Sequence, residues 1–331
     1  MVRASRAMTL DQDAGSGPLP SLAAPGNMSH MATRDSVVCA LDGGQSTVHL
    51  ARVGAELARV VAAPLTLVHV LGTMPDADWD GAAAVWLADD RPAVGARVGS
   101  ERDATRMLDT VAEAIGEPTA ERHVIPVGDP GRRVAKLAEG WSARLIVVGT
   151  RGNAPVTDAL GRVSSRLAAD APCPVLVIPH GLESHVFPLT WVARTLICGV
   201  DGSSHAWSAA ARAADLASHL GGSLRLVNVG VGIAADTVRD VVTQLRDVRG
   251  GDARRDAPPL DVEFEQRSGD PAEELERIAA TATAPLIAVG SRGLGPPRSP
   301  LLGPIARRLL QHARRPIMVV PATSGPADLA A

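Results

Sequence analysis

The chain has 331 residues, a length typical of two domains of roughly 150 residues each. Its 33 basic and 36 acidic residues are interspersed and leave a net charge of −3, which gives little support to a nucleic-acid-binding surface or an acidic tail. The sequence has no run of about 18 apolar residues, no apolar signal-peptide core and too few cysteines for a disulfide framework. We therefore expect a soluble, cytoplasmic protein that binds neither membrane nor nucleic acid.

Strands and helices are predicted to alternate after a disordered arm. Residues 1–34 are rich in Ser, Ala, Gly and Pro without a sustained apolar period, which predicts that arm. A first domain is expected over residues 35–180. Its first elements are strands at 37–41, 65–70 and 122–127 and helices at 46–61, 101–115 and 130–141. A parallel strand needs a crossover connection, usually a helix, so this order predicts βαβ units.

A glycine-containing segment completes this domain and recurs near the end of the chain. Residues 143–179 are predicted to form a buried strand, a glycine loop, a helix and a second buried strand, and residues 285–321 follow the same order. Such a loop gathers backbone N–H donors at a helix N-terminus, where an anion can sit, although its glycines could simply permit a tight turn. Three glycines hold matching places in each loop: Gly149, Gly152 and Gly161 in the first copy, and Gly290, Gly293 and Gly303 in the second.

Matching positions elsewhere indicate a tandem duplication. After a linker at 181–193, a second domain is expected over 194–322, followed by a tail at 323–331. Asp201 lies 159 residues after Asp42 (201 − 42), and Val229 lies 159 after Val70 (229 − 70). The glycine loops are 141 residues apart (290 − 149), so the first copy carries 18 additional residues (159 − 141). These fall in the irregular stretch 72–99, whose Trp79 and Trp86 are expected to cover the core or a partner surface.

The predicted fold class is α/β, with two doubly wound, five-stranded parallel sheets of strand order 3-2-1-4-5. This order opens a crevice at the carboxyl ends of strands 1 and 4. Asp42 or Asp201 leaves strand 1 there and could accept a hydrogen bond from a ribose hydroxyl, hold a metal-bound water, or cap the following helix. Val70 or Val229 ends strand 2 beside it and could offer its backbone to a base.

These residues resemble the universal stress protein family. The marks are V-D-G-S at 200–203, the H-V ending of the strand at 65–70, and the spacing G-x-x-G, nine residues, then G-[ST]. The resemblance covers 35–180 and 193–322 and implies ATP as ligand, with or without Mg²⁺. It also implies that the two repeats pair through their last strands like a covalently joined dimer, and it leaves a homodimer of the whole chain open. Carried over by position, the implied nucleotide-contacting residues are Asp42, Val70, Gly149, Gly152, Gly161, Arg162, Val163, Asp201, Val229, Gly290, Gly293, Gly303 and Ile305.

Both loops depart from this spacing. Eight residues separate Gly152 from Gly161, one fewer than the motif requires, and Arg162 replaces its Ser or Thr. The arginine could donate to phosphate or be solvated. The second loop keeps the spacing of nine, but Pro304 brings neither an N–H nor a hydroxyl to the site. Each lost phosphate hydrogen bond could cost about 1–3 kcal/mol, so either site could be vestigial.

Other chemistries receive less support. A phosphate-loop NTPase needs a Gly-Lys pair, and the only lysine, Lys136, is expected on the surface of a helix. Cys39 and Cys198 are expected in the core, whereas Cys173, flanked by prolines, could be more accessible, although nothing nearby in the sequence argues for reactivity. The predicted function is a stress-response regulatory module that senses adenine nucleotide. The alternatives are an interaction protein with degenerate sites and a slow ATP hydrolase that uses Asp42 or Asp201 as base.

Overall fold

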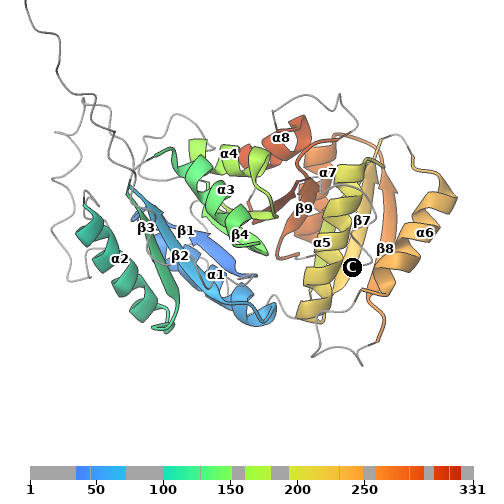
Figure 1. Ribbon diagram of the computed structural model, residues 1–331. Coiled ribbons are helices and arrows are strands. Elements are labelled where there is room, and N and C mark those ends of the chain that lie inside the picture. Colours follow the sequence, from blue (N-terminus) through green and yellow to red (C-terminus); the bar gives the residue numbers. More distant parts are fainter. Residues whose placement is uncertain are drawn as a thin grey trace, which may run out of the picture. The chain divides into compact units, whose positions relative to one another are not determined.

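The first repeat forms the alternation of strands and helices that its sequence predicts (Figure 1). The computed structural model describes residues 35–44, 46–71, 100–126, 128–150, 161–179, 194–230, 232–248, 258–282, 284–293, 302–312 and 314–321. The predicted arm, linker and tail, and Trp79 and Trp86, lie outside these residues. The elements of the first repeat are β1 (Val37–Ala40), α1 (Thr47–Val60), β2 (Leu65–Val70), α2 (Glu101–Ala114), β3 (Glu121–Ile125), α3 (Pro130–Gly140), β4 (Leu145–Gly149), α4 (Arg162–Asp170) and β5 (Val175–Ile178).

The second repeat has the same order of elements. They are β6 (Thr195–Gly199), α5 (Ser204–Leu220), β7 (Ser223–Val229), α6 (Ala235–Arg246), β8 (Asp261–Arg267), α7 (Pro271–Thr281), β9 (Ile287–Gly290), α8 (Pro304–His312) and β10 (Ile317–Val320). The predicted ends agree within two residues. The main difference is β3, which ends at Ile125 because Pro126 has no N–H to donate to the sheet. No helix in the described part of the chain is long and apolar enough to cross a membrane.

All ten strands belong to one sheet of order β3-β2-β1-β4-β5-β10-β9-β6-β7-β8. Within each repeat the strands are parallel and follow the predicted order 3-2-1-4-5, so the predicted fold class is confirmed. The repeats join where β5 and β10 pair antiparallel, with Leu176 opposite Met318; we call this pairing the seam. Because the seam is antiparallel, the strands of the two repeats run in opposite directions. Their carboxyl ends, and hence the two crevices, lie at opposite ends of the strands.

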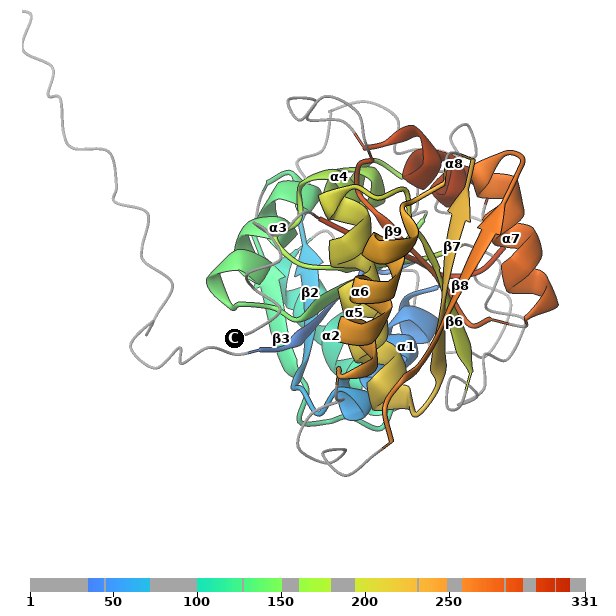
Figure 2. The ribbon, with the colours of Figure 1, turned by 90° about the vertical axis from the view of Figure 1, so that its right-hand side faces the viewer.

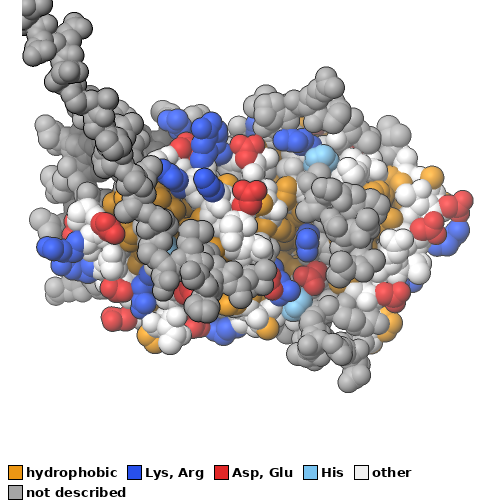
Figure 3. All heavy atoms as spheres, in the orientation of Figure 1, with side chains coloured by type: hydrophobic (Ala, Val, Ile, Leu, Met, Phe, Trp, Pro, Cys, Tyr) orange, Lys and Arg blue, Asp and Glu red, His pale blue; other side chains and the backbone are white. Residues whose placement is uncertain are grey.

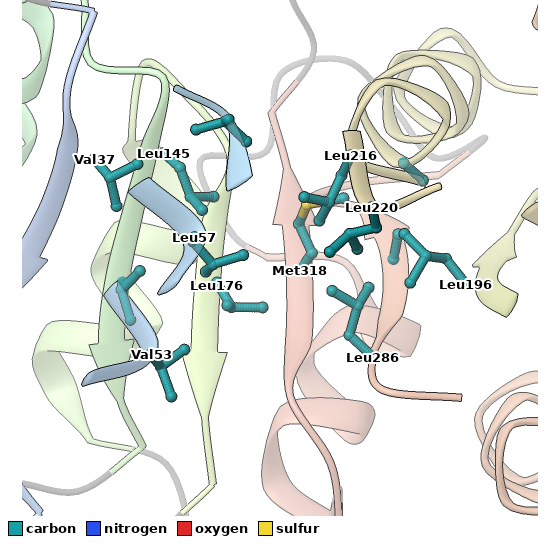
Figure 4. Packing of buried hydrophobic residues seen from close by; sticks show 14 of the residues in the cluster. Val37, Val53, Leu57, Leu145, Leu176, Leu196, Leu216, Leu220, Leu286 and Met318 are labelled. Carbon is teal, nitrogen blue, oxygen red and sulfur yellow. The ribbon is translucent and has the colours of Figure 1, made fainter. Parts of the chain in front are cut away.

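A continuous apolar core lies on one face of the sheet and crosses the seam. It buries side chains of α1, α2, α5 and α6 against alternate residues of the strands, and Leu176 and Met318 belong to it (Figure 4). Figure 2 shows α5 and α6 on one side of the second repeat's strands and α7 on the other. The outer charges are mixed in sign on the face that Figure 3 shows, as the sequence indicates.

The cysteines and the single lysine test three further expectations. Cys39 and Cys198 are fully buried in the core, as predicted, and Lys136 is exposed on α3. Cys173, whose accessibility the sequence leaves open, is also buried, at 7% exposed. Its burial raises the pKa of the thiol to about 12, so the side chain stays protonated and unreactive at neutral pH.

An equivalent ion pair anchors the helix that follows each glycine loop. Asp270 caps α7 by accepting from the N–H groups of Ala272 and Glu273, both at 3.1 Å, and it also receives Arg308 Nη1 of α8 at 2.5 Å. In the first repeat Asp129 caps α3 and lies 3.9 Å from Arg166 Nε of α4. Arg308 is the fifth residue of α8, so this ion pair ties the middle of α8 to the start of α7 and helps to hold the helix beside the crevice.

The seam should behave as one packed unit in unfolding experiments. We expect Leu176→Ala and Met318→Ala each to lower the free energy of unfolding by about 2–5 kcal/mol, because each removes fully buried side-chain atoms. The double variant should lose about 0.5–3 kcal/mol less than the sum, since the two residues face one another. Urea unfolding measures all three.

A matched control pair is Leu176→Ala with Leu245→Ala. Leu245 is as buried as Met318 but belongs to α6, which packs over β8 at the far edge of the sheet. These two losses should add, because β8 is separated from the seam strand β5 by four other strands of the sheet. Additive losses for Leu176 and Met318 themselves would contradict the seam as a packing unit.

Candidate functional site

In the second repeat, the aspartate after β6 lies directly against the glycine segment after β9. A Cβ atom built on Gly293 would be 2.5 Å from Asp201 Oδ2, too short for two non-bonded atoms. The other carboxylate oxygen, Oδ1, accepts a hydrogen bond from the backbone N–H of Ser203 at 3.0 Å. One oxygen of the Asp201 carboxylate is thus held by the backbone of Ser203, and the other lies against Gly293, which has no side chain. This places it in the crevice between the first and fourth strands of the repeat.

Two further glycines of this segment stand where a side chain would meet neighbouring chain. A Cβ on Gly290 would be 2.8 Å from the carbonyl carbon of His205 and 2.9 Å from its Cβ. Gly303 donates its N–H to the carbonyl oxygen of Ser291 at 2.8 Å, and a Cβ there would be 3.3 Å from that oxygen. Gly290, Gly293 and Gly303 all have φ outside the left-handed region. A tight turn therefore does not explain these glycines, whereas close approach of other chain segments does.

The first repeat closes its loop in the same way. Gly161 donates its N–H to Thr150 O at 2.5 Å, and a Cβ on Gly161 would be 2.7 Å from that oxygen. Gly149 ends β4, while Gly152 and the rest of the loop at 151–160 lie outside the described residues. The described part of this crevice therefore consists of the loop ends and the segment that begins at Asp42.

Neither aspartate caps the helix that follows it. In the second repeat the cap is Ser203, whose Oγ accepts from the N–H of Ala206 at 3.2 Å. In the first repeat Asp42 Oδ1 accepts from the N–H of Gly44 at 3.0 Å and from Thr47 Oγ1 at 3.4 Å. Both aspartates bond the backbone two residues further along the chain, which orients the carboxylate without committing it to the helix.

A hydrogen bond from strand 2 supports each aspartate, and the sequence did not reveal it. His69 Nδ1 lies 2.8 Å from the carbonyl oxygen of Leu41, and Asn228 Nδ2 donates to the equivalent oxygen of Val200 at 2.9 Å. Because a carbonyl only accepts, Nδ1 of His69 carries the proton, and burial lowers the pKa of its imidazole. The two residues differ in type but hold the residue immediately before the crevice aspartate in the same way. Their matching place beside the strand-2 valine was the available signal.

The sequence also did not reveal two basic side chains of the second crevice. His205 is in the first turn of α5, and Arg292 follows Ser291 in the glycine segment. The pKa of His205 is lowered, first by burial and then by the charge of Arg292, while Asp201 acts in the opposite direction. Nε of Arg292 is buried and has no hydrogen-bond partner among the described residues. In the first repeat Ser46 holds the position that corresponds to His205, so the two crevices differ at this position.

The remaining predicted site residues occupy the elements around the crevices. Val70 and Val229 end β2 and β7, which adjoin β1 and β6 in the sheet. Val163 and Ile305 are the second residues of α4 and α8, and both are partly buried. Arg162 is exposed at the first position of α4, as is Pro304 at the first position of α8. Among the described residues, no group of three or more His, Cys, Asp or Glu side chains is placed to hold a metal ion.

Comparison with known proteins identifies the family. The sequence model of the universal stress protein family matches residues 33–179 and again residues 193–321. The chain belongs to the universal stress protein family. Its two matches make it a tandem member, as the sequence resemblance implies.

Relatives of similar length share this organisation. Universal stress protein Rv2623 of Mycobacterium tuberculosis strain H37Rv is 29% identical over 291 residues, which cover 83% of this chain and 91% of that protein. Universal stress protein Rv2005c of the same strain is 28% identical over 309 residues, covering 88% and 99%. The crystal structure of a universal stress protein from Archaeoglobus fulgidus DSM 4304 matches with a TM-score of 0.60 at 20% identity, over 88% of this chain and all of that one, and so supports the fold.

The supporting hydrogen bond of the first crevice should make stability depend on pH. His69 is neutral in the folded protein and its pKa is lowered, so the unfolded chain binds a proton more readily. The free energy of unfolding should therefore fall as pH drops below about 6.5. We expect His69→Asn, which copies Asn228, to reduce this fall.

Urea unfolding of the wild type and His69→Asn at about pH 7.5 and about pH 5 measures this difference. His219, whose pKa is raised mainly by its hydrogen bond to Asp215, stabilises more as pH falls, but it is common to both proteins and cancels. Equal pH dependence in the two proteins would show that His69 is not the titrating group.

Proposed function

We propose that this protein binds adenine nucleotide, as ATP with Mg²⁺, in the crevice of its second repeat and acts as a regulatory module of the stress response. The observation that carries the proposal is the contact between the Asp201 carboxylate and Gly293. It brings an acceptor suited to a ribose hydroxyl against a segment of bare backbone suited to phosphate. The family resemblance points to the same ligand and the same residues.

The start of α8 supports phosphate binding despite the proline at its first position. The first backbone bond within this helix runs from Arg307 N to Gly303 O at 2.9 Å. The N–H groups of Ile305 and Ala306 precede it and have no partner within the helix, as at any helix N-terminus, so they could donate to an anion there. Pro304 removes one donor of this set. It does not remove the site.

The first crevice is expected to bind more weakly. Two serines follow Arg162 and could in principle replace the hydroxyl that the motif lacks. However, Ser164 Oγ and Ser165 Oγ both donate to Gly161 O, at 3.0 and 2.9 Å. Their hydroxyls are therefore turned to the backbone of the helix start. Of the described residues at this helix start, Arg162 is the one whose side chain could still donate to phosphate.

Regulation would act through the seam. The crevices open at opposite ends of the strands, so a nucleotide in one cannot touch the other. Each glycine loop leads through one helix, α4 or α8, into a seam strand, β5 or β10. A nucleotide that binds one arrangement of loop and helix more tightly than another would shift the protein towards that arrangement. The shift would reach the seam or a bound partner, and it would not require rapid hydrolysis of the nucleotide.

Equilibrium dialysis with labelled ATP and Mg²⁺ tests the binding proposal. The wild type should bind, and Gly293→Ala should bind at least about ten-fold more weakly, because its Cβ would press on Asp201 Oδ2. Gly140→Ala is the matched control, since a Cβ at that glycine meets no atom within 4 Å and its affinity should be unchanged.

Two results would remove the proposal. Failure of the wild type to bind ATP at millimolar concentration would leave a scaffold with degenerate sites, which Pro304 and the short first loop favour. Equal affinity of Gly293→Ala and the wild type would place the nucleotide elsewhere. Thermal unfolding of both variants confirms that any loss of binding is not a loss of the fold.

A further inference from the structure

The second crevice contains a titratable side chain, His205 of α5, which lies against the end of β9. His205 packs so closely on Gly290 that a Cβ on the glycine would lie 2.9 Å from the Cβ of the histidine. The imidazole therefore leaves the main chain at the point where β9 passes into the loop. A phosphate bound to that loop would lie near this side chain.

His205 lies near a positively charged side chain. Among the described residues, the charged groups that act on it are Arg292, from the glycine segment, and Asp201, from the turn after β6. Arg292 and burial both disfavour the imidazolium, and only Asp201 favours it. The positive end of the 17-residue helix α5 is a further source of positive potential, because His205 is in its first turn.

The guanidinium group of Arg292 has a buried donor that no described residue satisfies. Its Nε is buried and, in the part of the chain that the structure describes, has no hydrogen-bond partner. This state costs free energy unless a ligand or water accepts from the Nε–H. A bound phosphate would reduce two unfavourable effects. It would accept a hydrogen bond from Arg292, and its negative charge would offset the repulsion between the guanidinium of Arg292 and a protonated His205.

From this juxtaposition we infer that His205 is a proton-dependent ligand of the second crevice: binding of a nucleotide's phosphate chain there is coupled to uptake of a proton by the imidazole, so that affinity increases as pH falls. The inference rests on the proposed function and specifies how that site is regulated. The first crevice has Ser46 at this place and lacks the coupling. The two halves of the chain therefore respond differently to acidification.

The expected size follows from linkage. If the bound phosphate raises the pKa of His205 by one unit, affinity at low pH exceeds affinity at high pH by about ten-fold. Because the pKa of His205 is lowered in the free protein and a bound phosphate would raise it from there, most of this change should occur between about pH 7.5 and about pH 5. ATP's terminal phosphate also gains a proton near about pH 6, and this affects wild type and variants alike.

The first measurement is titration calorimetry of the full chain with MgATP at both ends of this range, in buffers of different ionisation enthalpy. The wild type should bind more tightly at the lower pH and take up protons. His205→Ser, which copies the first crevice, should lose most of the pH dependence that exceeds that of ATP itself, and His205→Gln should behave like it. Ser46→His is the reciprocal variant and should add pH dependence to the first crevice.

The second measurement follows the imidazole of His205 directly by NMR, with and without MgATP. Its pKa should rise on binding, and this result does not depend on how well any variant folds. An unchanged or lowered pKa, or equal pH dependence of affinity in the wild type and His205→Ser, would overturn the inference and leave the proposed function intact. No binding of ATP at any pH would remove both.

Discussion

The organising constraint in this protein is the close approach of a side-chain-free backbone segment to its neighbours at the end of a parallel sheet. At Gly290 the main chain and Cβ of His205 leave no room for a methyl group, and at Gly293 a methyl group would displace the Asp201 carboxylate. That contact places a carboxylate, the first turn of α5 and the start of α8 around one crevice. The strand order brings these segments to the same end of the sheet. The absence of a Cβ atom at Gly290, Gly293 and Gly303 then lets them approach closely enough to form the crevice.

The pairing at the seam determines where the crevices of the two repeats lie. Antiparallel pairing of β5 with β10 turns two similar sheets into one and sends their crevices to opposite ends of the strands. Each crevice can then diverge without disturbing the other, because the shared core depends on alternate strand residues and not on the loops. The chain shows such divergence: Asn228 and His69 perform one structural task with different chemistry, and His205 has Ser46 as its counterpart.

Most of the fold could be predicted from the sequence because it depends on local, repeated signals. Apolar runs, glycine boundaries and the offsets between Asp42 and Asp201 predict the strands, their order and the duplication. The missed features depend on residues that only the folded chain brings together. Burial of Cys173 beside the seam is a tertiary effect, and so is the meeting of Arg292 with His205, which are 87 residues apart (292 − 205). The seam strand register likewise has no signature in either strand alone.

The central claim is that the second crevice is a nucleotide site formed by an aspartate and bare backbone. The most direct test is a crystal structure of the full chain grown with MgATP. The account predicts electron density for a phosphate chain at the glycine segment beside Gly293, with the ribose next to Asp201. An empty second crevice at saturating nucleotide, or nucleotide bound away from Asp201, would contradict it.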